Sequence, residues 1–169
     1  MPTSYGALCT DFYVNMKLGV KMDLPSERDT VLNLFDRVRK ERPALSRFRR
    51  YEGELALESR DKEEPRQQWV ALRRTSVRAG AVNPESLADA YALHSLILTL
   101  APFYLGVSPL DIDLLEVTFG FDLEAPGNHN AIILDTLLAG SPIAGLLDDD
   151  RMTPIDVQPL LGVSLNKSG

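Results

Sequence analysis

Residues 10–24, TDFYVNMKLGVKMDL, alternate between apolar and polar side chains along most of their length. One set of alternate positions is apolar and consists of Phe12, Val14, Met16, Leu18, Val20 and Met22. The positions between them carry Asp11, Tyr13, Asn15, Lys17 and Lys21. A period of two residues predicts a β-strand, because successive side chains of a strand point to opposite faces of the sheet. We expect one face in the core and the other in water or against a partner.

A helix is predicted directly after this strand, over residues 24–43. Ser26 and Asp29 resemble an N-terminal cap, and Pro43 ends the helical pattern. The apolar positions recur at the spacing of one helix face and are Val31, Leu34, Phe35 and Val38. Basic residues gather near the C-terminal end, where positive charge complements the helix dipole.

Residues 46–80 predict two strands joined by a charged tip at 60–66 that contains Pro65. The first strand alternates over residues 50–58, and the second surrounds the sequence QWVALRRTSV. On the first strand we expect one face to carry Tyr51, Gly53, Leu55 and Leu57, and the other Arg50, Glu52, Glu54 and Glu58.

The next pair of elements is a helix followed by a strand. Asn83, Pro84 and Glu85 form a helix start, and the helix is expected to end at about Ala101, before Pro102. Past Ala90 this helix is apolar nearly all round, which indicates burial by the C-terminal segment or by a second copy of the chain. Residues 111–125 alternate as a strand, and a helix is expected over 128–139, ended by Gly140.

The predicted order is therefore βαββαβ, an α+β ferredoxin-like fold with an antiparallel sheet and both helices on one face. We expect this domain to span residues 1–140, with residues 141–169 forming a helical C-terminal extension packed on it. The extension is expected to hold a short helix from Ser141 and a short strand at 162–166. Because the chain stops three residues after that strand, we expect that a longer natural protein was truncated or that the strand pairs with another molecule. The fold alone implies no activity.

Composition favours a soluble, cytoplasmic protein. The chain has 169 residues, of which 44% are hydrophobic and 25% charged, as in ordinary globular domains. Cys9 is the only cysteine, which excludes an intrachain disulfide and a cysteine-rich zinc site. Residues 1–12 lack the features of a signal peptide, and the apolar stretch 87–107 is interrupted by charged and helix-breaking residues. We therefore expect no membrane partner.

Charge is spread unevenly along the chain. Residues 1–36 carry a net −2, residues 37–78 a net +6, and residues 79–169 a net −10. The basic middle is either a solvated face or an anion-binding face, and a solvated face is the more common case. Nucleic-acid binding is not favoured, because glutamates lie on the predicted sheet face and the aromatic pattern of RNA-binding sheets is missing.

No motif for catalysis or cofactor binding is found, so an enzyme is not the favoured class. The sequence has no nucleophile elbow, phosphate loop or dinucleotide fingerprint. His94 and His129 are the only histidines and have no spacing typical of metal ligands, so we predict no metal and no cofactor. His94 lies on an apolar helical stripe and is expected to be a hydrogen-bonded core or interface residue.

Two functional hypotheses remain. The first is a non-catalytic binding or assembly module that self-associates as a homo-oligomer through its sheet face or edge. The exposed sheet face expected for it carries Tyr13, Asn15, Lys17, Arg50, Glu52, Glu54, Glu116 and Thr118. The alternative is a small-molecule enzyme or a domain that binds a small anionic ligand at the free N–H groups of the helix start at 128–130. Its candidate ligand-binding residues are Asn128, His129, Asn130, Arg50 and Tyr13.

Overall fold

The computed structural model describes residues 9–59, 64–141 and 156–157. The chain divides into two compact units, Met1–Leu123 and Glu124–Gly169, whereas the sequence pattern predicts a division after residue 140. Most of the expected C-terminal extension, including the strand at 162–166, lies outside the described residues.

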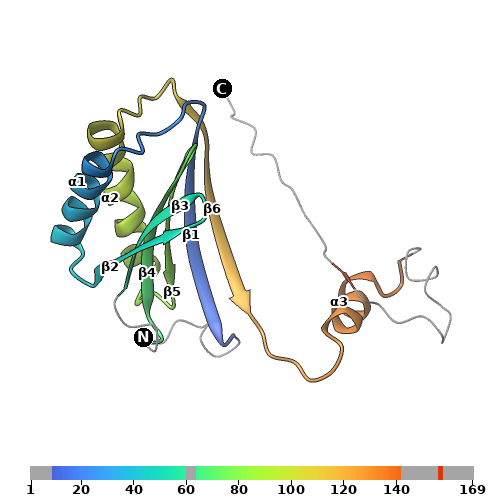
Figure 1. Ribbon diagram of the computed structural model, residues 1–169. Helices are drawn as coiled ribbons and strands as arrows, with labels where there is room; N and C mark the ends of the chain where they lie inside the picture. The colour runs from blue at the N-terminus through green and yellow to red at the C-terminus, as the bar shows by residue number, and fades with distance from the viewer. Residues whose placement is uncertain (1–8, 60–63, 142–155, 158–169) are drawn as a thin grey trace. The chain divides into compact units, whose positions relative to one another are not determined.

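The first unit is an α+β layer structure, as predicted, with two helices on one face of an open sheet (Figure 1). Its elements are β1 (Asp11–Val20), α1 (Arg28–Glu41), β2 (Leu45–Tyr51), β3 (Glu54–Ser59), β4 (Gln67–Arg73), β5 (Ser76–Val82), α2 (Leu87–Leu105) and β6 (Ile112–Asp122). The sheet has the order β2-β3-β4-β5-β1-β6, and every neighbouring pair is antiparallel. β1 therefore lies between β5 and the edge strand β6.

The ferredoxin-like βαββαβ order is not confirmed, because the sheet has six strands and a different strand order. Each of the two strands expected over residues 46–80 is in fact a hairpin. Two-residue turns at Glu52-Gly53 and Arg74-Thr75 divide them, and Gly53 has a φ of +70°. Tyr51 lies directly opposite Glu54 across the first turn, so the two side chains share a face of the sheet. An unbroken strand would have placed them on opposite faces, because one of their numbers is odd and the other even. The expected facing of Tyr51 with Leu55 and Leu57 is therefore wrong.

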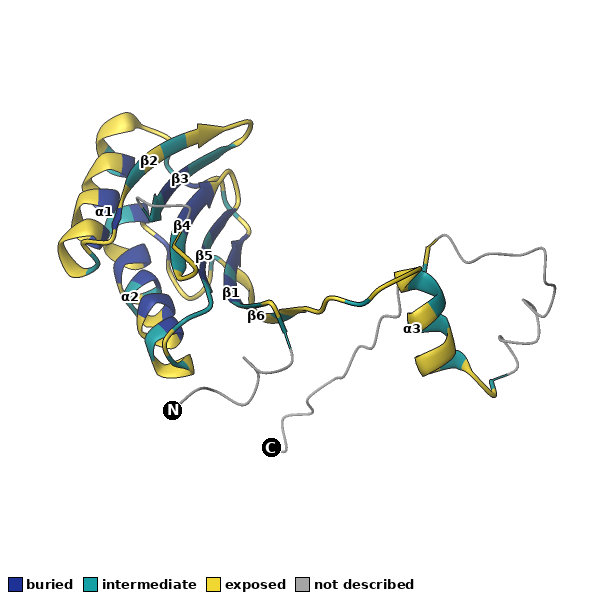
Figure 2. Cartoon of the chain, turned by 90° about the horizontal axis from the view of Figure 1, so that it is seen from below, coloured by how far each residue is buried: buried dark blue, intermediate teal, exposed yellow. Residues whose placement is uncertain are grey.

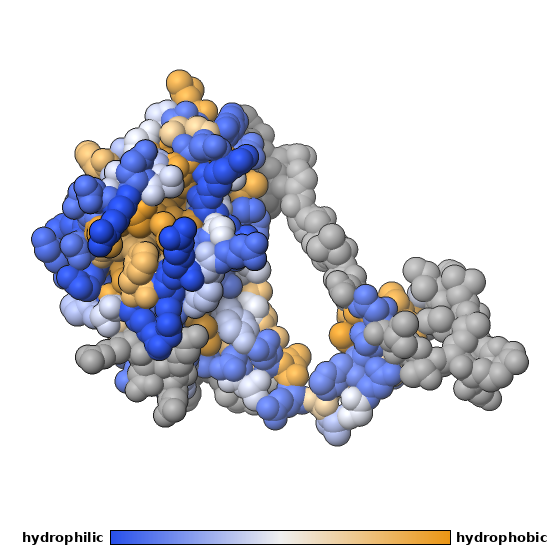
Figure 3. Space-filling model, in the orientation of Figure 1, coloured by the Kyte–Doolittle hydropathy of each residue, from blue (hydrophilic) through white to orange (hydrophobic). Residues whose placement is uncertain are grey.

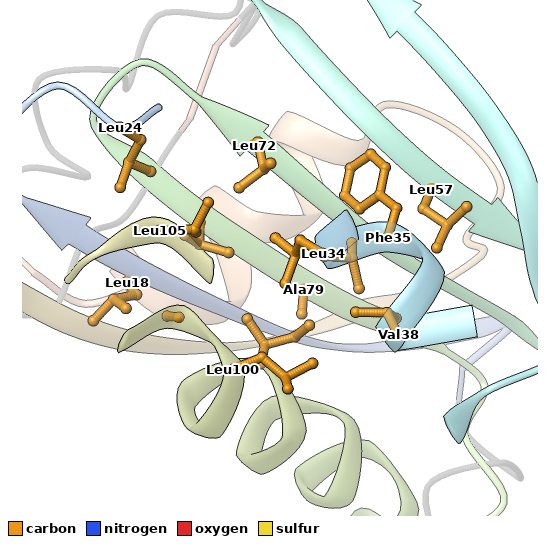
Figure 4. Close-up of a cluster of buried hydrophobic side chains, with 14 of the residues drawn as sticks. Leu18, Leu24, Leu34, Phe35, Val38, Leu57, Leu72, Ala79, Leu100 and Leu105 are labelled. Carbon is orange, nitrogen blue, oxygen red and sulfur yellow. The ribbon is translucent and has the colours of Figure 1, made fainter. Parts of the chain in front are cut away.

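The core lies between the helices and one face of the sheet. The predicted stripe of α1 is confirmed, since Val31, Leu34, Phe35 and Val38 are all buried. Figure 4 shows part of this α1 stripe, with Leu100 and Leu105 of α2, directed at residues of the sheet such as Leu72 and Ala79. Burial of each aliphatic side chain stabilises the fold by about 1.5–3 kcal/mol. The prediction for β1 also holds, because Val14, Met16, Leu18 and Val20 are buried on this face.

Helix α2 differs from the prediction at both ends. Its N-cap is Ser86, whose Oγ accepts a hydrogen bond from the backbone N–H of Asp89 at 3.1 Å. Asn83 instead joins β1 to the end of β5, because its side chain accepts from the N–H of Phe12 and donates to Asp11. The expected end before Pro102 is wrong, since the helix continues through Pro102 to Leu105 and ends at Gly106, with φ +67°.

The second unit contains α3 (His129–Leu138), which confirms the helix predicted over 128–139. The side chain of Asn128 caps it by accepting hydrogen bonds from the N–H groups of Asn130 and Ala131. Gly140 follows with φ +78°, a conformation that terminates helices readily.

Candidate functional site

β6 is a long edge strand. It has 11 residues, about twice the usual strand length, and it pairs with β1 on one side. Among the described strands, none pairs with its other side. A strand edge of this kind presents unpaired backbone N–H and C=O groups to which another chain can add a strand.

An apolar stripe lies along this edge strand. It consists of Leu115, Val117 and Phe119, which lie directly opposite Leu18, Met16 and Val14 of β1 and so on the helix-bearing face. Their β1 partners are at most 2% exposed, whereas the three stripe residues are 54%, 44% and 45% exposed. Figure 2 shows the change from dark blue on β1 to yellow on β6. The described helices of this unit therefore leave the stripe accessible to solvent.

Aromatic packing extends the stripe toward the end of β6. The ring of Phe12 on β1 packs against Phe119 and Phe121, with centroid distances of 6.4 and 5.0 Å. Aromatic pairs of this kind contribute about 0.5–1.5 kcal/mol beyond their buried area. They also restrict the positions of the aromatic rings at this end of the stripe.

The strand at the opposite edge of the sheet, β2, is protected against pairing with another chain by its charged side chains. Its seven residues, LSRFRRY, include Arg47, Arg49 and Arg50, and charged side chains on an edge oppose the addition of another strand. Figure 3 shows long hydrophilic side chains bordering the small apolar areas on the visible face of this unit. β6 also carries charge, on Asp113, Glu116 and Asp122, but it has no lysine, arginine or proline and presents the apolar stripe on one face.

Tyr13 and Arg50 from the expected ligand-binding group lie on opposite faces of the sheet. Arg50 is opposite Leu55, which packs against the helix-side core. Tyr13 is on the open face, where its ring covers Gly120 and its hydroxyl donates to Oδ2 of Asp122. That bond to a carboxylate raises the pKa of Tyr13 to about 12. The structure does not bring these two residues together.

The Asn128-His129-Asn130 triplet belongs to the second unit, and its polar groups make local contacts. Asn128 caps α3, and Nε2 of His129 donates to the carbonyl of Ala125 at 2.7 Å. Oδ1 of Asn130 accepts from the N–H of Val157 at 3.0 Å. These contacts account for the residue types at a helix start, so the ligand-binding role remains an untested prediction.

His94 is 4% exposed, which agrees with the expected core position on α2. Neither ring nitrogen has a hydrogen-bond partner of good geometry in the described part of the chain. Burial lowers the pKa of His94, and the nearby backbone of Val14 offsets part of this effect. Burial therefore favours the uncharged form of His94 at this core position.

The described residues show few features of a ligand-binding or membrane protein. Within residues 9–59, 64–141 and 156–157, no three histidine, cysteine or acidic side chains are grouped as a metal site. The described helices include none that is both long and apolar enough to cross a membrane.

A wide hollow of about 870 Å³ lies where α1 ends and α2 begins, and a partly buried ion pair between Arg42 and Asp89 borders it.

A second hollow, of about 470 Å³, lies on the open face of the sheet. Its residues include Trp69, Arg78 and Glu58, none of which the sequence analysis proposed as a ligand-binding residue. The signal that was available is that Trp69 is the only tryptophan in the sequence. No known family model matches the chain, and no curated protein matches it either.

Proposed function

We propose that this protein is an assembly module whose copies join through β6, forming a homodimer with a continuous antiparallel sheet. The observation that carries the proposal is the combination of an 11-residue edge strand, to whose outer side no described strand pairs, with the half-exposed apolar stripe Leu115, Val117 and Phe119. Addition of a strand satisfies the free backbone groups, and the stripe gives the contact its hydrophobic component. Closed two-fold dimers are also the commonest symmetric assemblies.

The sequence of β6 favours one register, centred on Thr118. In a two-fold antiparallel pair, directly opposite residues share a face. Centring on Thr118 places Val117 opposite Phe119 of the second copy, and Leu115 opposite Phe121 of the second copy. All four central pairs on the helix-bearing face are then aliphatic–aromatic, a type of cross-strand pair that stabilises sheets.

The charges of β6 support the same register. With the axis at Thr118, Glu116 lies opposite Gly120 and Asp122 lies opposite Leu114. Moving the axis to Phe119 would place Glu116 opposite Asp122 twice, and like charges directly opposite are destabilising. Moving it to Val117 would place Asp113 opposite Phe121 on the apolar face. The register centred on Thr118 avoids the pairing of like charges and moves Asp113 to the end of the contact, opposite Leu123, which lies beyond β6.

Cysteine cross-linking tests the register directly. In a Cys9→Ser background, Thr118→Cys places two thiols directly opposite each other, and mild oxidation is expected to give a disulfide-linked dimer. The matched variant Glu116→Cys places its thiols four residues apart, or about 13 Å, and is expected to remain uncross-linked. Equal cross-linking of both variants, or preferential cross-linking of Glu116→Cys, would overturn the proposed register.

Light scattering on the full chain tests the assembly. Wild-type protein is expected to be dimeric at micromolar concentrations, and Val117→Lys is expected to be monomeric, because it places a charge on the apolar stripe. Leu110→Lys is the matched control, since Leu110 is 87% exposed in the loop before β6 and is expected to leave the dimer intact. A wild-type monomer would refute the proposal, and so would open-ended species, which would indicate head-to-tail pairing of β6 with β2.

A further inference from the structure

The hollow on the open face has one small residue at its floor and polar and aromatic residues around it. Ala56 of β3 lies at this floor and is only 2% exposed, because the larger side chains around it cover it. Around this floor, β2 and β3 contribute Tyr51, Glu54 and Glu58, and β4 and β5 contribute Trp69, Arg73 and Arg78.

The two arginines that line the hollow, Arg73 and Arg78, already form ion pairs with Glu54. Oε2 of Glu54 accepts from Nε of Arg73 at 2.5 Å and lies 3.4 Å from Nη1 of Arg78. The guanidinium carbon of Arg78 also lies 5.4 Å from the centre of the Trp69 ring, within the range of a cation–π contact. Trp69 is therefore held between Arg78 and Gly80, and both guanidinium groups have a carboxylate partner.

Glu58 forms no ion pair with a described cation, although Arg47 of β2 lies directly opposite it and Arg49 lies opposite Ala56. Its Oε1 accepts a hydrogen bond from the hydroxyl of Tyr51 at 2.6 Å. Its Oε2 is shielded from solvent and has no hydrogen-bond partner among the described residues, and no described cation forms an ion pair with it. An ionised carboxylate in a partly buried place is costly unless it is paired, so this side chain has acceptor capacity for one or two further donors.

We infer that this hollow binds a guanidinium or primary ammonium group, with Glu58 as the counter-ion and Trp69 and Tyr51 as aromatic neighbours. The lining carries three carboxylates, those of Glu52, Glu54 and Glu58, against the two arginines. The second carboxylate oxygen of Glu58, which has no donor among the described residues, favours a cation over an anion at this point of the hollow. A guanidinium group also matches a carboxylate in a planar, two-pronged pair and stacks favourably beside aromatic rings.

The inference is independent of dimer formation, because the hollow lies on β2 to β5 and the proposed interface on β6. The same cationic chemistry is offered by a free alkylguanidine and by an arginine side chain of a peptide. Agmatine and N-acetyl-arginine amide represent these two sources, and saturable binding of either supports the site. N-acetyl-citrulline amide is the matched neutral probe, since it keeps the shape of arginine but has no charge.

Intrinsic fluorescence gives the readout, because Trp69 is the only tryptophan in the chain and lines the hollow. Titration of the full chain with N-acetyl-arginine amide is expected to produce a saturable change in Trp69 emission. The citrulline probe is expected to produce none at the same concentrations. An equal response to both probes, or no saturable response to agmatine or the arginine probe, would overturn the inference.

Two variants assign the effect to Glu58. Glu58→Gln keeps the shape of the side chain and is expected to weaken binding at least tenfold, while Glu85→Gln, at an exposed site before α2, leaves it unchanged. Unchanged affinity in Glu58→Gln would refute the assignment. Tyr51→Phe removes the neighbouring donor without removing the charge, so it is expected to retain binding even where Glu58→Gln fails to fold. Loss of binding in a folded Tyr51→Phe would likewise contradict a role of Glu58 as the counter-ion.

Discussion

Replacing Gly80 with alanine is expected to destabilise the first unit although the backbone conformation tolerates any residue there. Gly80 lies in β5, between Trp69 of β4 and Asn15 of β1. A Cβ atom at this position would lie 2.2 Å from Oδ1 of Asn15 and 2.6 Å from Cε2 and Cζ2 of Trp69. The amide of Asn15 can rotate away, but the indole ring is rigid and must move by about 1 Å to reach ordinary contact distance.

The magnitude follows from two opposing effects. Overpacking of this kind costs about 1–3 kcal/mol, and the lower chain entropy of alanine in the unfolded state returns about 0.4–1 kcal/mol. We therefore expect Gly80→Ala to lower the free energy of unfolding by about 1–2 kcal/mol. Urea denaturation followed by circular dichroism measures this change, because it does not depend on the tryptophan.

A double-mutant cycle identifies the cause. In a Trp69→Leu background the rigid ring is gone, so Gly80→Ala is expected to cost at least about 1 kcal/mol less than in the wild-type background. Two results would refute the steric explanation: a Gly80→Ala variant as stable as wild type, or an equal cost of the substitution in both backgrounds.

Three further predictions concern single side chains. The pKa of His94 is lowered in the folded state, so the unfolded state takes up a proton more readily than the folded state does. The free energy of unfolding of the wild type should therefore fall as the pH drops below about 6.5. Urea titrations of His94→Leu from pH 7.5 to 5.5 should lack part of this pH dependence, and His129→Gln should retain it. Asp89 accepts from Arg42 at 2.6 Å and from Gln68 at 3.1 Å, so Asp89→Ala should cost about 1–2 kcal/mol in thermal or urea unfolding. Glu85→Ala, whose partner Arg66 is 3.9 Å away and exposed, should change stability by less than about 0.5 kcal/mol. Asn128→Ala removes the cap of α3 and should cost that helix about 1 kcal/mol, seen as faster amide hydrogen exchange over residues 131–138, whereas Asn128→Asp should retain most of the protection.

The features that sequence predicted well are those that depend on local periodicity. The alternation in β1 and the apolar stripe of α1 correspond to buried faces, because a side-chain period directly reports which side of an element meets the core. The end of α2 was predicted less well. Pro102 is tolerated near the C-terminal end of the helix, and Gly106 supplies the left-handed residue that terminates it.

The strand order could not be obtained from the same patterns. A two-residue turn such as Glu52-Gly53 leaves the alternation of apolar and polar residues nearly uninterrupted. Two short strands joined by such a turn therefore show the same sequence pattern as one long strand. The position of β6 beside β1 depends on contacts between residues about 100 positions apart. Trp69 and Glu58 were overlooked for a related reason, because their proximity results from the register of β3 with β4.

The two proposals together lead to a last prediction, on bivalent binding. Pairing through β6 would place both open faces on the same side of one sheet. Eight strand spacings of about 4.8 Å then separate the two hollows, or about 40 Å. A peptide with an arginine at each end of a proline-rich spacer of about 13 residues spans this distance, at about 3.1 Å per residue.

Such a peptide is expected to bind the wild-type dimer at least tenfold more tightly than a peptide with one arginine, because the second contact is intramolecular. Val117→Lys should remove this gain by dissociating the dimer, while the affinity for the single arginine stays unchanged. A spacer of five residues is too short to bridge the sites, so it should give no gain with either protein. If the short and long spacers bound the dimer equally well, the two hollows could not lie on one continuous face, and the arrangement centred on Thr118 would be wrong.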